Sequence, residues 1–175
     1  GRAASIESQV DTVEFRELLN TPGPVLLDGG MGTMLQARGL SIGEWPELAA
    51  LEHPDWLEDI HRAYVEAGAQ ILCANTFGAN REKLGRTGRT VEEVVPPSVE
   101  IARRAARGRA LVALDVGPTG QLLEPTGTLR FEEAVDIFAQ TVRAGVQAGA
   151  DLILIETMSD TYEVKAAVLA AKENT

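Results

Sequence analysis

Cysteine and histidine are scarce in this sequence, which has one cysteine and two histidines in 175 residues. A single cysteine excludes an intrachain disulfide. Cys73, His53 and His61 are too few nitrogen and sulfur ligands for a tetrahedral zinc site, so we expect no metal site within this chain. Cys73 lies inside an aliphatic run, which favours a buried structural thiol over a nucleophile. The two histidines are interpreted as surface or packing residues.

Long apolar runs and excess positive charge are also missing. The sequence has no segment of about 18 apolar residues, which a membrane-spanning helix would need. It also has no hydrophobic region of the kind found in signal peptides. The net charge of −10 argues against a nucleic-acid or anionic membrane surface. With an ordinary apolar fraction of 45%, the sequence predicts one cytoplasmic domain that binds neither nucleic acid nor membrane.

Four aliphatic runs are present, and each ends at a side chain with hydrogen-bonding oxygens. They cover residues 25–28, 71–75, 111–115 and 152–156, and they end at Asp28, Asn75, Asp115 and Glu156. Continuous apolar runs are typical of strands buried on both faces of a parallel sheet. Ligands bind at the carboxyl ends of such strands. We therefore expect the four polar ends to line one site.

An internal repeat supports the same reading. Residues 67–76 (AGAQILCANT) align without gaps with residues 148–157 (AGADLILIET), at an offset of 81 residues. The repeat places Asn75-Thr76 on Glu156-Thr157. Each copy begins where a predicted helix ends, turns at a glycine and continues into a strand, so each predicts the same helix-to-strand junction.

Helices are predicted between the strands, mainly at residues 12–19, 54–67, 90–108, 131–148 and 162–172. Thr90 with Glu93 forms a capping-box pattern, and Asp160 can cap the last helix. In the second helix, the 3.6-residue period predicts a buried face made of a single stripe: Trp56, Ile60, Ala63, Tyr64 and Ala67.

The alternation of strands and helices predicts an α/β fold with parallel strands. The strand ends are 47, 40 and 41 residues apart (28 to 75, 75 to 115 and 115 to 156), a regular rhythm that favours a (β/α)8 barrel. A closed barrel needs about 250 residues, so we interpret residues 12–175 as its N-terminal half, about four βα units. Residues 1–11 are interpreted as a flexible arm or tag remnant. The alternative is a small open doubly-wound sheet.

Asp28 and Glu156 are the strongest candidates for binding. Two carboxylates facing a cavity suit a substrate ammonium group, or they could act as general acid and base. Helix capping or a salt bridge is the structural alternative. Asp115 is a weaker candidate, because the loop that follows it could satisfy its side chain.

The loop after the first strand, Asp28-Gly29-Gly30-Met31-Gly32-Thr33, is the second candidate feature. Its glycines would let backbone N–H groups approach a carboxylate or a phosphate, although it could also be a plain tight turn. Asn75 and Thr76 could orient a substrate or merely fix the next turn. The predicted substrate-binding residues are Asp28, Gly29, Gly30, Thr33, Asn75, Thr76, Asp115, Glu156 and Thr157.

Four strand-end motifs carry a family resemblance: LLDGGMGT at 26–33, ANTFGAN at 74–80, DVGPTG at 115–120 and LIETM at 154–158. In this order they resemble the homocysteine S-methyltransferase family. Residues 117–123 and 160–172 are most similar to the N-terminal homocysteine-binding module of cobalamin-dependent methionine synthases. The resemblance implies a (β/α)8 barrel that binds homocysteine, ligates its sulfur to zinc and transfers a methyl group to give methionine.

The resemblance also implies roles for particular residues. Asp28 and Glu156 would hold the amino group of homocysteine, and the glycine loop and Asn75-Thr76 would shape the pocket around it. The family's zinc ligands are three cysteines on later strands, beyond residue 175, and Cys73 matches none of them. We therefore expect no catalytic residue in this chain and no turnover by it alone. The remaining half of the barrel would be its partner, and cobalamin-binding and folate-binding domains could be further partners. The methyl donor would be methylcobalamin on a partner domain or, as in other family variants, S-methylmethionine, a betaine or S-adenosylmethionine.

Two other functions remain open at this point. The glycine loop could bind a phosphorylated small molecule in a different (β/α) enzyme. The chain could also be a non-catalytic fragment that forms a homodimer through open strand edges.

Overall fold

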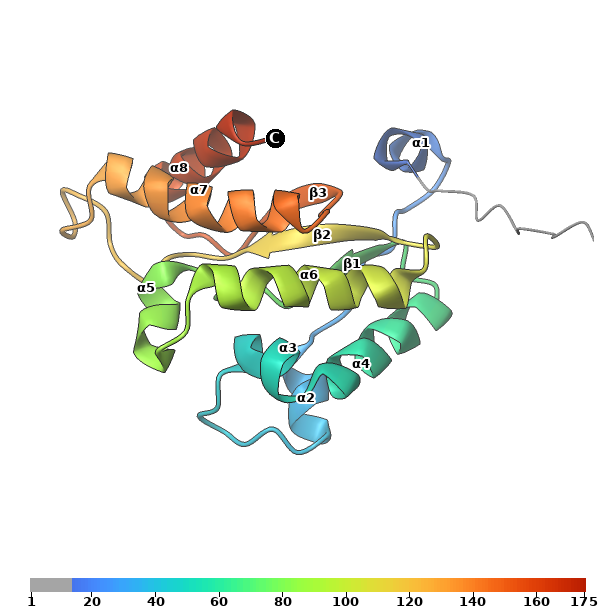
Figure 1. Ribbon diagram of the computed structural model, residues 1–175. Coiled ribbons are helices and arrows are strands. Elements are labelled where there is room, and N and C mark those ends of the chain that lie inside the picture. Colours follow the sequence, from blue (N-terminus) through green and yellow to red (C-terminus); the bar gives the residue numbers. More distant parts are fainter. Residues whose placement is uncertain (1–13) are drawn as a thin grey trace, which may run out of the picture.

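The computed structural model describes residues 14–175, so the predicted arm at residues 1–11 lies outside the described part. Its centre is a parallel sheet in the order β1-β2-β3, formed by β1 (Ile71–Cys73), β2 (Leu111–Val116) and β3 (Leu152–Ile155) (Figure 1). Leu72 pairs with Val112 and Leu114 pairs with Ile153, which sets the register of the three strands. The predicted α/β class with parallel strands is confirmed.

The first of the four predicted strands is reduced to a single bridge between Leu27 and Ile71. The backbone of residues 26–28 still runs along β1, because Asp28 N donates to Ile71 O and Gln70 N donates to Leu26 O. Leu26 and Leu27 are 52% and 47% exposed, so the expected burial on both faces is wrong for this segment. Residues 26–28 have β1 as a hydrogen-bonded neighbour on one side, and no described strand covers their other side.

Burial rises toward the middle of the sheet. Every residue of β2 is buried, whereas the four residues of β3, at the opposite edge from residues 26–28, are half-buried. The described helices connect and cover these strands: α1 (Phe15–Asn20), α2 (Gly32–Ala37), η1 (Pro46–Leu48), α3 (Ala49–Glu52), α4 (Pro54–Glu66), α5 (Arg81–Leu84), η2 (Gly85–Thr87), α6 (Val91–Ala106), α7 (Phe131–Gln147) and α8 (Thr161–Glu173).

The predicted helix caps are present. Thr90 Oγ1 accepts a hydrogen bond from Glu93 N at 3.2 Å, and Glu93 Oε2 accepts one from Thr90 N at 2.9 Å. Asp160 Oδ1 accepts a hydrogen bond from Tyr162 N at 2.8 Å. Both caps satisfy N–H groups that have no partner inside the helix, so α6 and α8 begin where the sequence predicts.

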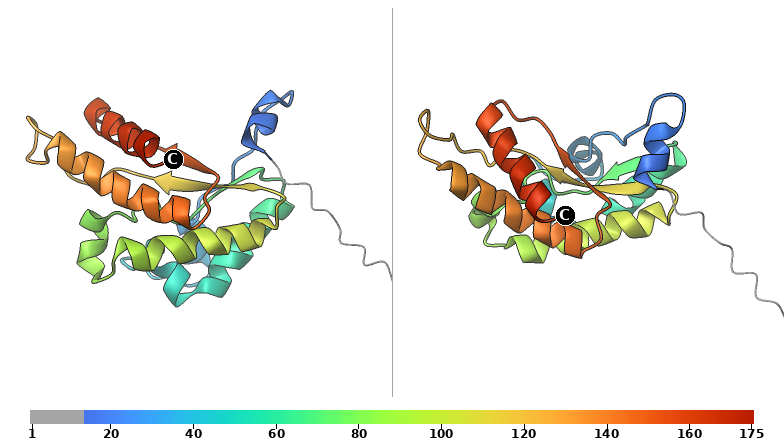
Figure 2. Two further views of the ribbon diagram at one scale, coloured as in Figure 1. Left: turned by 45° about the horizontal axis from the view of Figure 1, so that its top comes forward. Right: turned by 90° about the horizontal axis from the view of Figure 1, so that it is seen from above.

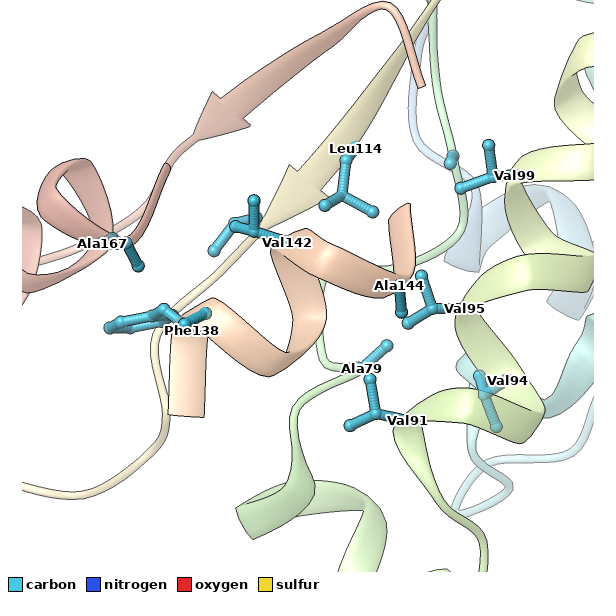
Figure 3. Close-up of a cluster of buried hydrophobic side chains, with 14 of the residues drawn as sticks. Ala79, Val91, Val94, Val95, Val99, Leu114, Phe138, Val142, Ala144 and Ala167 are labelled. Carbon is cyan, nitrogen blue, oxygen red and sulfur yellow. The ribbon is translucent and has the colours of Figure 1, made fainter. Parts of the chain in front are cut away.

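The main core lies between the sheet and helices α4, α6, α7 and α8, on one face of the sheet. Figure 2 shows α6 and α7 side by side along this face. Figure 3 shows Val95 of α6 next to Ala144 of α7, with Phe138 on the other side of α7, toward Ala167 of α8. A Cβ at Gly145 would lie 2.6 Å from the Leu114 side chain, so the glycine permits the close approach of α7 to β2.

The opposite face of the sheet carries much less cover. A small cluster there joins Leu18 of α1 to Ile71, Leu111 and Ala113. Because side chains alternate along a strand, Asp115 faces the same side as Leu111 and Ala113. The residues that end the strands thus point to the face that the main helices leave open.

The internal repeat of the sequence is also a repeat of structure. Gly68 and Gly149 both have positive φ, at 106° and 94°. Each is the turning residue of a Schellman motif, in which Ala69 N donates to Tyr64 O and, 81 residues later, Ala150 N donates to Gly145 O. The predicted helix-to-strand junction is therefore confirmed in both copies.

The repeat extends to the residue before each strand. Gln70 Oε1 accepts a hydrogen bond from Leu26 N at 2.9 Å. Asp151 Oδ2, at the matching position, accepts one from Val112 N at 2.8 Å. In both copies this side chain ties the new strand to the one before it.

The buried face of α4 differs from the predicted stripe. Ile60 is buried as expected, but Ala63 and Ala67 are exposed, and the stripe includes His61 instead. His61 is fully buried, and burial lowers its pKa to about 4, which makes it a neutral packing residue. No helix within residues 14–175 is long and apolar enough to cross a membrane.

Candidate functional site

A cavity of about 480 Å³ opens at the carboxyl ends of the strands. Seven of the nine predicted site residues line it: Asp28, Gly29, Gly30, Asn75, Thr76, Asp115 and Glu156. Residues far apart in the sequence meet here because parallel strands end at the same edge of a sheet. Glu47 also lines the cavity, and no lysine, arginine or histidine of the described chain does.

Asp28 is anchored to the neighbouring strand. Its Oδ2 accepts a hydrogen bond from Cys73 N at 2.9 Å, which fixes the half-buried carboxylate at the cavity wall. Burial raises the pKa of Asp28, and the charge of Glu156 raises it further, while the hydrogen bonds from Cys73 act in the opposite direction. The carboxylate has no cationic partner among the cavity residues.

Asp115 is the most deeply placed of the carboxylates, at 8% exposure. Its backbone is held by Thr76, whose hydroxyl accepts from Asp115 N at 3.0 Å and donates to Asp115 O at 2.9 Å. The Oδ1 atom of Asp115 is buried and has no hydrogen-bond partner within residues 14–175. Burial, the neighbouring carboxyl group of Glu156 and the charge of Asp28 together raise the pKa of Asp115 to about 8.

Glu156 links the other two carboxylates. It follows β3 directly, and its backbone N donates to Val116 O at 3.1 Å, which continues the ladder past the last strand residue. Its side chain is half-buried and acts electrostatically on both Asp28 and Asp115. The three carboxylates thus form one electrostatically connected group, and such a group favours a cationic ligand.

The polar groups of Asn75 and Thr76 are engaged with backbone. Asn75 Nδ2 donates to Pro46 O at 2.6 Å, and the Thr76 hydroxyl bonds the backbone of Asp115 as described above. Both side chains are buried. These contacts fix the loops around the cavity, the structural role that the sequence left open.

The glycine loop forms another wall. Tyr64 of α4 donates from its hydroxyl to Gly30 O at 2.9 Å. A Cβ at Gly29 would lie 2.8 Å from the same hydroxyl, so the close contact between loop and helix requires glycine there. Residues 29–32 line the cavity with little side-chain bulk, which leaves their backbone accessible to a ligand.

Thr33 and Thr157 do not line this cavity. Thr33 lies in the first turn of α2 and is exposed. Thr157 is exposed as well, with φ of 57° in the left-handed region. The tight turn after β3 therefore directs Glu156, and not its neighbour, to the cavity.

Glu47 and Phe77 line the cavity without having been predicted to do so. Glu47 Oε1 accepts a hydrogen bond from Gly78 N at 3.1 Å. Phe77 packs so closely on Gly117 that a Cβ there would lie 2.6 Å from its ring. Glu47 lies in η1, a short 3-10 helix. Its position near the strand ends depends on tertiary packing, so no local sequence pattern predicts it. Phe77 directly follows Asn75-Thr76, so extending that motif by one residue would have found it.

Cys73 also lines the cavity and is half-buried. Burial raises the pKa of its thiol well above the usual range, and the negative charge of Asp28 adds to the effect. A thiol held in this protonated form is a poor nucleophile and a poor metal ligand. Residues 14–175 contain no group of three or more His, Cys, Asp or Glu side chains arranged to hold a metal ion.

A parallel α/β fold with an acidic cavity at its strand ends belongs to the class of folds that bind small molecules at that edge of the sheet. The family model of homocysteine S-methyltransferases matches residues 25–175. The chain therefore belongs to the homocysteine S-methyltransferase family.

Individual relatives agree with this family. The chain is 34% identical to the methionine synthase of Mycobacterium tuberculosis over 160 residues, which cover 83% of this chain and 13% of that protein. It is 34% identical to the homocysteine S-methyltransferase of Escherichia coli, covering 87% of this chain and 56% of that protein. The chain thus spans only part of the length of these relatives.

Solved structures give the same result. The metallated form of the homocysteine methyltransferase MmuM from Escherichia coli superposes with a TM-score of 0.79 at 28% identity. The match covers 90% of this chain and 62% of that one. At this level of identity and coverage, the similarity extends over nearly the whole described fold.

Proposed function

We propose that this chain forms the amino-acid-binding half of the site of a homocysteine S-methyltransferase, which converts homocysteine to methionine. The observation that carries the proposal is the group of three connected carboxylates, Asp28, Asp115 and Glu156, in a cavity lined by no cationic side chain. Such a cavity suits the ammonium group of an amino acid, by charge-assisted hydrogen bonds.

The two sides of the cavity match the two ends of an amino acid. The carboxylates of Asp28 and Glu156 would bind the ammonium group from the strand ends. The backbone of Gly29, Gly30 and Gly32 would face the ligand carboxylate, because N–H groups of a glycine-rich turn can approach an anion closely. The homocysteine side chain would then extend toward the open side of the cavity.

We also propose that the sheet is the first half of a (β/α)8 barrel. The four main helices contact one face of the sheet, as on the outside of a barrel, whereas a doubly-wound sheet carries helices on both faces. The repeated junctions at Gly68 and Gly149 support a regular succession of βα units.

The described residues do not fit a zinc site. The only cysteine has a thiol pKa raised above its usual value, and no group of three suitable ligands is present in residues 14–175. We propose that zinc is held by cysteines on later strands of the family's barrel. Methylcobalamin, and cobalamin-binding and folate-binding domains in the same cytoplasmic protein, are proposed on the similarity to methionine synthases.

The alternatives are less well supported. A phosphorylated ligand at the glycine loop would face three carboxylates across the same cavity, and like charges repel. The observation that favours association of two copies through strand edges is the exposure of Leu26 and Leu27, which are about half exposed beside β1. Sedimentation at several concentrations would test that association.

Isothermal titration calorimetry with L-homocysteine tests the proposed function. The chain should bind L-homocysteine and L-methionine, and it should bind inorganic phosphate far more weakly. Asp28→Asn should weaken amino-acid binding by about 1.5–3 kcal/mol, the range for a hydrogen bond to a charged group. Asp55→Asn, at an exposed site on α4 outside the cavity, is the matched control. Absence of amino-acid binding by the unmodified chain would contradict the proposal.

A further inference from the structure

Asp115 and Glu156 are adjacent carboxyl groups in a place where two negative charges are costly. Asp115 is 8% exposed, and its buried Oδ1 atom has no hydrogen-bond partner among the described residues. Glu156 lies two residues after Leu154, which pairs with Asp115, so both side chains line the same cavity from neighbouring strands. Two carboxylates that share a cavity without a cationic side chain repel each other, and a proton on one of them removes that repulsion. The pair therefore holds one proton when no ligand is bound.

The surroundings of the pair supply nothing else that could neutralise it. Asp28 faces it from the segment before the glycine loop, Cys73 from β1 and Glu47 from η1. Asp28 and Glu47 are acidic, and the thiol of Cys73 is protonated because its pKa is raised. No lysine, arginine or histidine of the described chain lines the cavity. A cation that balances the site must therefore arrive with the ligand.

We propose that binding is an exchange of cations: the ligand's ammonium group displaces the proton shared by Asp115 and Glu156 and donates hydrogen bonds to their carboxylates. This inference rests on the proposed function, because it takes an amino acid as the ligand. The released proton passes to the solvent, and the ammonium group keeps all three of its own. The site then holds one positive charge before binding, as the proton, and one after binding, as the ammonium group.

The exchange makes Asp115 a determinant of specificity. A ligand with an ammonium group replaces the lost proton, whereas a ligand with a neutral hydroxyl at the same position leaves two adjacent charges unbalanced. Linkage also gives the pH dependence of binding. Because one proton is released, the affinity should increase about tenfold for each unit rise in pH, as long as the pair is protonated and the ligand's amino group is charged.

Calorimetry with L-methionine measures the exchange, because this ligand has no titratable thiol. Titrations at pH 6.5 in phosphate and in imidazole, two buffers with different heats of ionisation, give the number of protons released. We expect about one proton released per L-methionine bound, since a carboxyl pair at this pH still holds its shared proton. The number should fall toward zero above the pH at which the pair ionises.

Two controls isolate the pair. Asp115→Asn removes the exchangeable proton but keeps the shape of the side chain, so its proton release should fall to near zero. The 2-hydroxy analogue of L-methionine, which lacks the ammonium group, should bind at least tenfold more weakly than L-methionine if a charge-assisted bond is lost. If Asp115→Asn does not fold, the proposal is still tested by the buffer comparison on the unmodified chain and by the binding of the 2-hydroxy analogue.

The outcomes separate the two proposals. Binding of L-methionine without proton release, or with equal release by Asp115→Asn, would overturn the exchange and leave the proposed function standing. No binding of L-methionine or L-homocysteine at any pH would overturn both.

Discussion

The shared proton at Asp115 should make the folded chain less stable as the pH rises. The pKa of Asp115 is raised from 3.8 to about 8, first by burial and then by Glu156. A carboxyl group with a raised folded pKa stabilises the fold fully below its unfolded pKa. That stabilisation is lost as the pH rises through the folded value, here from about 4 to about 8.

The size of the effect follows from the separation of the two pKa values. Between about pH 5 and about pH 7 the unfolded chain has released this proton and the folded chain has kept it. Each pH unit in this window then lowers the free energy of unfolding by about 1.4 kcal/mol, or by about 2.5 kcal/mol over the window. Other groups add their own pH dependence, so the comparison with a variant isolates this one.

Asp115→Asn is the variant to compare, because it cannot ionise. Its free energy of unfolding, measured by urea denaturation at each pH, should fall less than that of the unmodified chain by about 2.5 kcal/mol over the same window. Asp55→Asn, exposed and outside the cavity, should keep the slope of the unmodified chain. Parallel curves for Asp115→Asn and the unmodified chain would refute the assignment of the proton to this pair.

Three other predictions concern packing, capping and reactivity. Gly145→Ala should destabilise the chain by about 1–3 kcal/mol in urea denaturation, because the added Cβ would lie 2.6 Å from Leu114, whereas Gly85→Ala, with open space around it, should be near neutral; equal effects would contradict the close packing of α7 on β2. Thr90→Ala should cost about 1 kcal/mol by removing the cap of α6, and an unchanged urea midpoint would argue against that cap. Cys73 should react with a disulfide reagent at pH 8 much more slowly in the folded chain than in urea, because burial and Asp28 keep its thiol protonated; equal rates would contradict the raised pKa.

The polar strand ends could be predicted because their signal is local. A continuous aliphatic run followed by a carboxylate has few placements in a parallel sheet, since burying an unpaired charge is costly. The repeat at offset 81 added a second local signal, and Gly68 and Gly149 adopt the same conformation as a result. The caps at Thr90 and Asp160 belong to the same group, because each depends on residues within one turn.

Features that depend on neighbours in space could not be predicted. Leu26 and Leu27 form an apolar run like the residues of β2, yet they are about half exposed because the described chain covers them on one side only. The placement of Asp115 near Glu156 depends on the register of β2 with β3, which cannot be read from the sequence.

The buried stripe of α4 was misplaced for a chemical reason. Alanine is apolar but small, so Ala63 and Ala67 are tolerated on an exposed face, while His61 counts as polar in a periodicity argument although its neutral form can pack in a core. The periodicity predicted the helix and the burial of Ile60 correctly, but it placed Ala63 and Ala67 on the buried face and left out His61.

The central claim is that the carboxylates at the strand ends bind the ammonium group of an amino acid. A crystal structure of the chain with L-homocysteine tests it most directly. We predict an ammonium nitrogen within about 2.7–3.2 Å of carboxylate oxygens of Asp28 and Glu156, the range of such hydrogen bonds. A ligand bound outside the cavity, or one whose own carboxylate faces Asp28 and Glu156, would contradict the claim.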